Sequence, residues 1–490
     1  MPEINILPPT GSSRPSITST LENPNVPIYH NTNSPEPTFG SDVDVREISL
    51  LLNSGLKIDL RGYVEAVIVN ESMFNMKING SVIVNDMVGA LEKFQITGGE
   101  QLNLKIYKPK SENLLIWRED LIINKIQKHE VDPMNGYAKY QMIFTSNSFV
   151  RSIKKRIFKS YKNIPLINAI KNIYSEMSSN DLMYEDPQIT LTEPYICTGN
   201  NPHDAIDFLA QRASSPQKYF VFYERFVPVT GQYIDGNSFA GSHYFGSVEN
   251  LINSTSETGI ETLVFGPKTN ANSESGNTIR VSKFIKDTNF NQLESVYLGL
   301  NKTEFTYLDL QNRTNTTKKI SYSDADFFSN TSEDFYNNSF MTESNRFRVE
   351  TQEPGMKKIS TTKRFGNKNK SDWLPYNIFG MLTKNYFKIG AIIQGGTNNI
   401  SVGSIVQFNV ISYFEKIANA SSGTPPLDEM YSGKYYVTGV THVITQDKYQ
   451  KTLELSRGSS RIALNENASD FLYDKIKTAR PDLAKLVIGR

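Results

Sequence analysis

Residues 63–69 read YVEAVIV and residues 76–86 read MKINGSVIVND, and these two stretches decide the fold class. Both are rich in β-branched residues, which favour strands over helices. In the first stretch these residues fall on both faces, as expected for a strand that is covered on both sides. Asn85 and Asp86 end the second stretch with a turn signal. The sequence therefore predicts two successive strands and a β-rich fold around them.

More strands are predicted on the C-terminal side of this pair. Gly98 and Gly99 break the chain before QLNLKIY at 101–107, in which apolar and polar residues alternate. Residues 121–128 and 137–145 predict two further strands on either side of a turn. Five or more strands within roughly 100 residues are typical of a small barrel or sandwich. We therefore predict a first small β-rich domain, either a barrel or a sandwich, at residues 45–150.

The next region, residues 151–275, mixes helix and strand signals. Leu166, Ile170 and Ile173 keep a helical spacing. Asn201 followed by Pro202 predicts the start of a second helix, because Asn caps a helix N-terminus and Pro fits its first turn. Residues 219–223 are almost all apolar, which predicts a strand covered on both faces. We interpret this region as a helix-containing α+β linking module.

Polar sequence and then a second β-rich region follow. Residues 276–380 are rich in Asn, Thr and Ser and predict a peripheral insertion of short strands and long loops. Residues 381–460 predict a second β-rich domain from four strand-like runs at 387–394, 403–410, 435–444 and 449–455. Proline-rich residues 1–44 predict a flexible arm, and residues 461–490 predict a helical tail. The expected fold class is mainly β with α+β parts: two β-rich regions, a mixed α/β link between them and a polar insertion.

Composition narrows the class of protein. The chain has 490 residues, 38% of them hydrophobic and 21% charged, which is enough for several domains with buried cores. Its net charge of +1 gives no general attraction to nucleic acid or to an anionic membrane. No apolar run reaches the roughly 18 residues that span a bilayer, and the N-terminus lacks the pattern of a signal peptide. We expect a soluble protein that is made in the cytoplasm and does not insert into membranes.

Motifs for chemistry are absent from the sequence. The five histidines, His30, His129, His203, His243 and His442, show no short spacing typical of a metal pair, so each is interpreted as a surface or partner-bonded residue. Cys197 is the single cysteine, so it forms no internal disulfide, and its apolar neighbours predict a small buried side chain. The sequence holds neither a Gly-x-Ser-x-Gly elbow nor a phosphate-binding loop. We predict no catalytic, metal or cofactor-binding residues, and hence no enzyme.

One cluster of charge is a candidate functional surface. Six basic residues lie within 12 positions with no acid among them: Arg151, Lys154, Lys155, Arg156, Lys159 and Lys162. Ile153, Ile157 and Phe158 alternate with these residues, which predicts that one face of the segment is buried. A solvated basic face is one interpretation. The other is a positive surface that lines a lumen or meets an acidic partner.

Three segments, taken in order, carry a resemblance to a known family. The first is GSVIVND at 80–86, which leads through residues 94–96 to GGEQL at 98–102. The second combines DAIDFLA, YFVFYE and YFGSVENL at 204–210, 219–224 and 244–251. The third is YSGKYYVTGVTH and its partner run at 431–442 and 449–457. Together they resemble the baseplate hub proteins of contractile-tailed bacteriophages, a family related to the hub part of type VI secretion spike proteins.

The resemblance implies a fold and a role. It implies a homotrimer in which two tube-barrel domains per chain form a pseudo-sixfold ring between the sixfold tail tube and the threefold central spike. The partners that it implies are the tail tube protein, a separate central spike protein and other baseplate proteins, with genomic DNA passing through the lumen. The expected location is the baseplate of the virion tail. The resemblance covers roughly residues 45–265 and 380–460, and residues 290–375 match nothing in the family.

Two other functions remain open at this point. A tube-terminal or distal-tail ring protein would share the barrel architecture but form a sixfold ring. A tail-associated cell-wall hydrolase would instead cleave purified cell wall, through an acidic residue that sequence does not single out.

Overall fold

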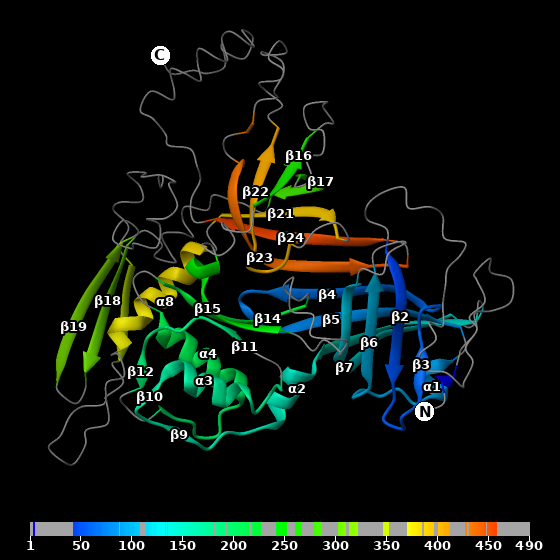
Figure 1. The fold of residues 1–490 in the computed structure, drawn as a ribbon, viewed down its shortest axis with the longest axis horizontal. Coiled ribbons are helices and arrows are strands. Elements are labelled where there is room, and N and C mark those ends of the chain that lie inside the picture. The colour runs from blue at the N-terminus through cyan, green and yellow to red at the C-terminus, as the bar shows by residue number, and fades with distance from the viewer. Residues whose placement is uncertain are drawn as a thin grey trace, which may run out of the picture.

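The structure is a computed structural model that describes most of the chain between residues 43 and 457. The described residues are 3–4, 43–107, 114–226, 242–251, 260–266, 278–286, 302–309, 313–321, 346–351, 370–384, 387–395, 400–411, 427–428, 431–446 and 448–457, without residues 88, 133, 135, 180–181, 192–194 and 215–217. The predicted tail at 461–490 and nearly all of the predicted arm at 1–44 lie outside them. The described part is mainly β, so the predicted fold class is confirmed (Figure 1).

The first barrel is built from strands of the N-terminal third of the chain. Its strands lie in the order β3-β2-β6-β7-β8-β5-β4, and every neighbouring pair is antiparallel. Among the described residues no ladder joins β3 to β4, so hydrogen bonds between strands do not close this barrel, and the two-residue strand β1, Glu3–Ile4, pairs with β3. The short helix α1, Ala90–Lys93, follows β5. The strands expected at 63–69, 76–86 and 101–107 are β4, β5 and β6. The strand bounds are Asp44–Leu51 for β2, Lys57–Asp59 for β3, Val64–Ser72 for β4, Asn75–Asp86 for β5, Gln101–Tyr107 for β6, Leu114–Asp132 for β7 and Tyr137–Ser146 for β8.

The second barrel is closed by its own hydrogen bonds. Its ladder runs β23-β22-β16-β17-β21-β24 and returns to β23. The four C-terminal runs predicted as strands are strands, and they supply β21 to β24. The bounds are Glu261–Phe265 for β16, Thr278–Lys286 for β17, Phe387–Gln394 for β21, Ile405–Val410 for β22, Gly433–Ile444 for β23 and Tyr449–Arg457 for β24.

Two of these strands lie outside the range expected for a second barrel. From the sequence, β16 was expected in the linking module and β17 in the polar insertion, whereas both pair within the closed ladder. The reason is that β16 pairs with β22, which is more than 100 positions away along the chain, and local patterns carry no information on such distant partners. The strands of this barrel therefore begin at Glu261 rather than near residue 381.

The two barrels share an order of strands. The run β6-β7-β8-β5-β4 in the first barrel corresponds to β22-β23-β24-β21-β17 in the second. Each contains a long hairpin whose turn has four residues, 133–136 in β7–β8 and 445–448 in β23–β24. They differ at one strand, because β2 is antiparallel to β6 whereas β16 is parallel to β22.

The linking module, residues 147–251, packs helices against a small sheet of order β11-β15-β14 (Figure 1). Helix α4 begins as predicted, because the N–H of Asp204 donates to the side-chain oxygen of Asn201 at 2.8 Å and Pro202 occupies the first turn. The strand predicted at 219–223 is β14, and all of its residues are buried. Its elements are α2 Asn147–Lys154, β9 Ser160–Tyr161, β10 Ile164–Pro165, α3 Leu166–Tyr174, β11 Leu182–Tyr184, β12 Thr190–Leu191, β13 Tyr195–Ile196, α4 Pro202–Ala213, β14 Phe220–Arg225 and β15 Ser242–Ser247.

The polar region also contains elements of its own. Strands β18, β19 and β20, Lys302–Asp309, Thr314–Ser321 and Arg346–Thr351, form a separate sheet at the edge of the molecule (Figure 1). Helix α8, Lys370–Lys384, was not expected, because Pro375 and Gly380 lower the helix propensity of its sequence. Packing compensates for this, since α8 contacts α4 and the Arg212 guanidinium lies 5.2 Å from the centre of the Trp373 ring.

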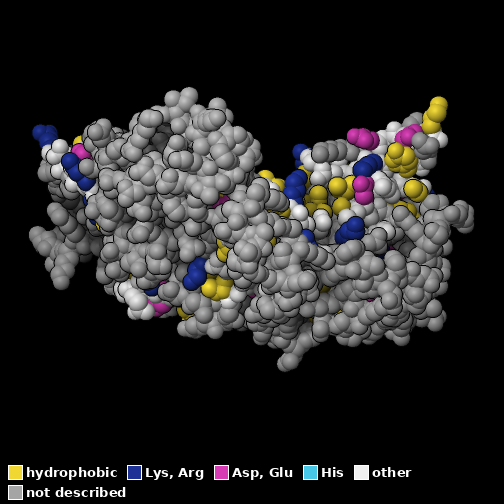
Figure 2. Space-filling model, turned by 90° about the horizontal axis from the view of Figure 1, so that it is seen from above, with side chains coloured by type: hydrophobic (Ala, Val, Ile, Leu, Met, Phe, Trp, Pro, Cys, Tyr) yellow, Lys and Arg dark blue, Asp and Glu magenta, His cyan; other side chains and the backbone are white. Residues whose placement is uncertain are grey.

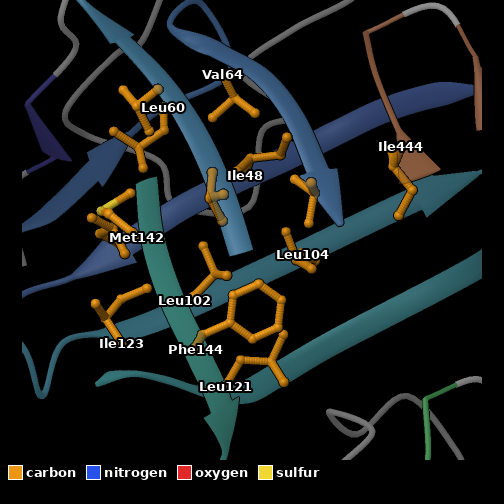
Figure 3. Packing of buried hydrophobic residues seen from close by; sticks show 14 of the residues in the cluster. Ile48, Leu60, Val64, Leu102, Leu104, Leu121, Ile123, Met142, Phe144 and Ile444 are labelled. Carbon is orange, nitrogen blue, oxygen red and sulfur yellow. The ribbon is translucent and has the colours of Figure 1, made fainter. Parts of the chain in front are cut away.

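The surface of the first barrel carries mixed side chains, whereas its core is apolar. Seen from above, the described side chains at the first-barrel end of the molecule include apolar, basic and acidic groups (Figure 2). Inside, Leu102, Leu104, Met142 and Phe144 point toward one another in a single core (Figure 3). Ile444 of β23 reaches into the same core, which therefore includes a side chain from the second barrel.

Candidate functional site

The contact between the two barrels is a β-ladder within one chain. Strand β23 pairs antiparallel with β4, from Ile444 opposite Val67 to Gly439 opposite Ser72. The two barrels thus belong to one continuous sheet of fourteen described strands. Because backbone hydrogen bonds and the buried Ile444 side chain both cross this contact, the barrels are expected to move as one unit.

A chain of buried polar side chains crosses the same junction. The Tyr449 hydroxyl donates to Nδ1 of His442 at 2.7 Å, and Nε2–H of His442 donates to Oε1 of Glu71 at 3.1 Å. The second carboxylate oxygen of Glu71 accepts the N–H of Phe226 at 2.7 Å. Glu71 lies on β4, His442 and Tyr449 on the β23–β24 hairpin, and Phe226 just after β14. The chain therefore joins both barrels and the linking module.

The pKa shifts fit this direction of donation. Burial raises the pKa of the Tyr449 phenol, so its hydroxyl keeps its proton. Burial also lowers the pKa of His442 in spite of Glu71, so the ring is neutral near pH 7. Burial alone would raise the pKa of Glu71, but the hydrogen bonds from His442 and Phe226 outweigh it and hold that pKa below its ordinary value.

A second buried group ties the first barrel to the linking module. The Arg118 guanidinium, fully buried on β7, donates to both oxygens of Asp120 at 2.6 and 2.9 Å and to Oε1 of Glu224 at 3.1 Å. It also donates to the carbonyl oxygens of Arg225 and Phe226, at 3.3 Å each. These contacts satisfy most of the donors of the guanidinium, which makes the buried charge tolerable.

Glu224, the acidic partner of Arg118 on β14, is fully buried, and burial disfavours its ionised form. The Ser146 hydroxyl donates to its second oxygen at 2.5 Å. Burial raises the pKa of the Glu224 carboxyl to about 7, while the neighbouring Arg118 opposes that rise. This carboxyl therefore changes charge in the physiological range, which makes the junction sensitive to pH.

Because the Tyr449–His442–Glu71 chain is buried, its histidine cannot act as a catalytic base on a substrate. A Tyr–His–Glu chain resembles the arrangement by which enzymes orient a histidine base. Here both ring nitrogens of His442 already have partners, and Glu71, His442 and Tyr449 are all buried. A substrate atom has no access to the imidazole. We interpret the group as a structural tie between the barrels.

No cluster of metal-ligating side chains occurs among the residues that the structure describes. In the same residues, no helix is both long enough and apolar enough to cross a membrane. Cys197 is buried, as predicted, and burial raises the pKa of its thiol, which leaves it a poor nucleophile.

The six residues of the predicted basic cluster are all exposed on the linking module. Arg151 and Lys154 lie in the last turn of α2, where positive charge suits the helix dipole, and the others follow as far as β9 and β10. The cluster is not free of acid in space, because Lys155 and Lys159 donate to Glu176 at 3.0 and 2.5 Å. Within the described residues the remaining four form no ion pair. This acidic partner could not be predicted from the segment itself, because Glu176 lies outside it, just after the C-terminal end of α3.

The apolar residues of this segment are not all buried, contrary to the prediction. Ile157 is buried, whereas Ile153 and Phe158 are exposed, with 76% of Phe158 accessible. Ile196, opposite Ser160 in the β9–β13 pair, is exposed as well. The alternation was interpreted as one buried face, but helix α2 ends at Lys154 and the backbone becomes extended at Lys155, so the apolar residues no longer share one helix face. The basic cluster therefore lies on a surface that also shows apolar groups.

No family model matches the chain, and no curated protein matches its sequence. Similar solved structures include a tail protein of Neisseria meningitidis, with 9% identity, a TM-score of 0.47 and coverage of 86% of this chain and 97% of that one.

Two further solved structures are similar at the same level. The 43 kDa tail protein of prophage MuSo2 from Shewanella oneidensis has 9% identity, a TM-score of 0.49 and coverage of 84% and 98%. A type VI secretion component of E. coli, described as structurally similar to T4 bacteriophage tail proteins gp27 and gp5, has 10% identity, a TM-score of 0.40 and coverage of 86% and 78%. Identities and scores this low identify no function for this chain.

Proposed function

We propose that this chain is a structural subunit of the baseplate hub of a contractile phage tail. Three copies form a ring with pseudo-sixfold symmetry that joins the sixfold tail tube to the threefold central spike. The observation that carries the proposal is the shared strand order of the two barrels in one chain. Three such chains present six similar barrels, which is what a junction between sixfold and threefold symmetry requires.

The junction between the barrels suits the transmission of load. A six-residue ladder, an apolar side chain and two buried polar groups link the barrels and the linking module. This role needs neither an active site nor a cofactor, and we propose that the chain is not an enzyme. Its partners in the proposal are the tail tube protein, the central spike protein and other baseplate proteins. Genomic DNA passes through the lumen of the ring, and the protein does not insert into membranes.

The mass and symmetry of the assembled particle test this proposal. Mass photometry of the full chain, alone and with tube and spike proteins, should give three copies, and averaged electron micrographs should show six similar lobes in a threefold ring. A chain that stays monomeric and binds neither protein would refute the proposal. A ring of six chains would favour a distal-tail protein instead, and reproducible cleavage of purified cell wall would favour the hydrolase.

We propose that the basic cluster faces the lumen or a partner. Reversing the charge of Lys154, Lys155 and Arg156 should impair assembly or genome passage, while the subunit stays folded because all three side chains are exposed. Lys93 and Lys434 are exposed lysines on other elements, and reversing their charge provides the control. Unchanged infectivity of phage that carry the triple variant would count against this position of the cluster.

A further inference from the structure

After helix α2, residues 157–161 pair with residues 195–200 and form a two-stranded ribbon on the linking module. The N–H of Ile157 donates to the carbonyl oxygen of Asn200 at 3.0 Å, and the ladder of β9 with β13 continues the pairing. Strand β9 runs along the lower edge of the linking module (Figure 1). Backbone hydrogen bonds therefore hold the β9–β13 ribbon together at both of its ends.

The two faces of the β9–β13 ribbon differ in burial, because successive residues of a strand point to opposite faces. On one face Tyr161 and Tyr195 are buried directly opposite each other, and their rings stack at 6.4 Å. The outer face carries Phe158, two positions before Ser160, and Ile196, directly opposite Ser160. Phe158 is 76% exposed and Ile196 is 50% exposed. Single exposed apolar residues are common, but here two large ones share one face.

The exposed ring of Phe158 packs on one side against backbone. It lies over Gly199, so closely that a Cβ at that position would come within 3.1 Å of the ring. Gly199 has a φ of +95°, in the left-handed region that favours glycine, and its N–H donates to the carbonyl oxygen of Ile157 at 2.9 Å. An aromatic side chain that is supported in this way loses little conformational freedom when a partner covers it, and this favours binding.

Positive charge accompanies these apolar side chains. Lys155 and Lys159 form ion pairs with Glu176. Four other exposed basic side chains form no ion pair within the described residues: Arg151, Lys154, Arg156 and Lys162. Charges around a contact steer a partner of opposite charge toward it, while apolar side chains within the contact supply affinity. This surface therefore suits a partner that carries both acidic and apolar groups.

A protein segment fits this surface better than a nucleic acid does. Proteins that bind single strands stack successive bases on several aromatic rings. Among the described residues of the ribbon, Phe158 is the one aromatic side chain on the outer face, and Ile196 offers no flat ring for a base. Glu176 also places a negative charge within the basic cluster, which opposes the approach of phosphate groups.

We propose that the outer face of the β9–β13 ribbon is a docking surface for an acidic segment of another tail protein. Apolar side chains of that segment cover Phe158 and Ile196, and its Asp and Glu side chains pair with the basic cluster. The basic cluster then faces a protein partner rather than the lumen. The inference rests on the proposed function, which supplies the tail in which the partner is found.

Photo-crosslinking from position 158 in assembled tails identifies what covers the ribbon. The full chain with p-benzoylphenylalanine in place of Phe158 is assembled into tails and irradiated, and the crosslinked peptides are sequenced by mass spectrometry. We expect a peptide of another tail protein in which Asp and Glu outnumber Lys and Arg and apolar residues lie among them. Tyr184, on β11 and 47% exposed, is the matched control, because the same probe at this exposed aromatic position should not yield that peptide.

The outcomes separate this inference from the proposed function. Crosslinks from position 158 to DNA, to a second copy of this chain or to a peptide without an excess of acidic residues overturn the docking surface and leave the hub role standing. Tails that contain the chain but give no crosslink from this position overturn it as well. A chain that never enters tails overturns the proposed function and this inference with it.

Substitutions measure the apolar and the charged contributions separately. Phe158→Ser should weaken binding of the crosslinked tail protein to the full chain roughly tenfold or more at low and high salt alike, because it removes a buried aromatic ring from the contact. Lys154→Glu with Arg156→Glu should weaken it mainly at low salt, because salt screens exposed charges. Tyr184→Ser is the control and should change neither. All these side chains are exposed, so the variants should stay folded. Equal binding by Phe158→Ser and Tyr184→Ser would contradict the proposal.

Discussion

Replacement of Glu71 by leucine should loosen the contact between the two barrels. The carboxylate accepts one hydrogen bond from His442 at 3.1 Å and one from the N–H of Phe226 at 2.7 Å, and both donors are buried. Leucine accepts neither, and each buried donor left without an acceptor costs about 1–3 kcal/mol. The ring of His442 is neutral, so its loss of Glu71 leaves no unpaired charge on it. With two donors left without an acceptor, we expect Glu71→Leu to destabilise the junction by roughly 2–6 kcal/mol.

Hydrogen exchange measures this effect at the junction itself. Amides of β4 and β23 should exchange at least roughly thirtyfold faster in Glu71→Leu, because about 1.4 kcal/mol corresponds to a tenfold change in an opening equilibrium. Amides of the separate β18–β19 sheet should not change. The matched control is Glu65→Gln on the same strand, whose exposed carboxylate pairs with Lys139 and contributes at most about 1 kcal/mol.

A double-mutant cycle tests the reasoning more strictly. If Glu71 and His442 form one buried unit, Glu71→Leu with His442→Leu should cost less than the sum of the two single variants, by about 1 kcal/mol or more. Additive costs would show that the two side chains act separately. Exchange in Glu71→Leu that equals that of the Glu65→Gln control would refute the view that this group ties the barrels together.

Three further changes test the junction and the first core. Burial raises the pKa of Glu224 from 4.5 to about 7, so the folded state binds this proton more tightly than the unfolded state. The proton's contribution to stability is full below pH 4.5 and falls by about 1.4 kcal/mol per pH unit as the pH rises to about 7. Glu224→Gln should flatten the fall of the thermal midpoint between these pH values, and an unchanged slope would contradict the assignment. Ile444→Ala should cost about 2–5 kcal/mol in denaturant unfolding, because it leaves a cavity in the first core, and a cost below 1 kcal/mol would show that the core does not depend on the second barrel. Gly80→Ala should lower the free energy of unfolding by about 1–3 kcal/mol or more in the same assay, because its added methyl group would overlap the Phe144 ring and lie 2.7 Å from the Ile68 carbonyl oxygen. A variant as stable as the wild type would contradict this packing.

The features that sequence predicted are those that local chemistry determines. The capped start of α4 at Asn201 and the strands at 63–69 and 387–394 follow from side-chain type and spacing within a few residues. Helix α8 was missed because its local sequence disfavours a helix and packing against α4 compensates. Tertiary context overrides propensity in such segments.

The junction could not be predicted for a different reason. Glu71 and His442 are 371 positions apart, and neither belongs to a motif. From the sequence, His442 was interpreted as a surface or partner-bonded residue, and its partner is set only by the register of β4 against β23. Likewise, the basic cluster was visible as a charge pattern, but Glu176 and the exposed Phe158 depend on how α3 and β9 fold back. Pairing in space, rather than residue type, carries the missing information.

The buried polar groups between the barrels suit a contact that forms while the chain folds. Glu71 and His442 are both fully buried, and each is a hydrogen-bond partner of the other. A buried carboxylate that loses its partners is costly, so such a group is stable only where the partners are always at hand, as they are within one chain. An exposed charge, such as those of the basic cluster, stays hydrated in the free subunit and can meet a partner later at little cost. The two kinds of charged group therefore fit two different stages, folding for Glu71 and assembly for the basic cluster.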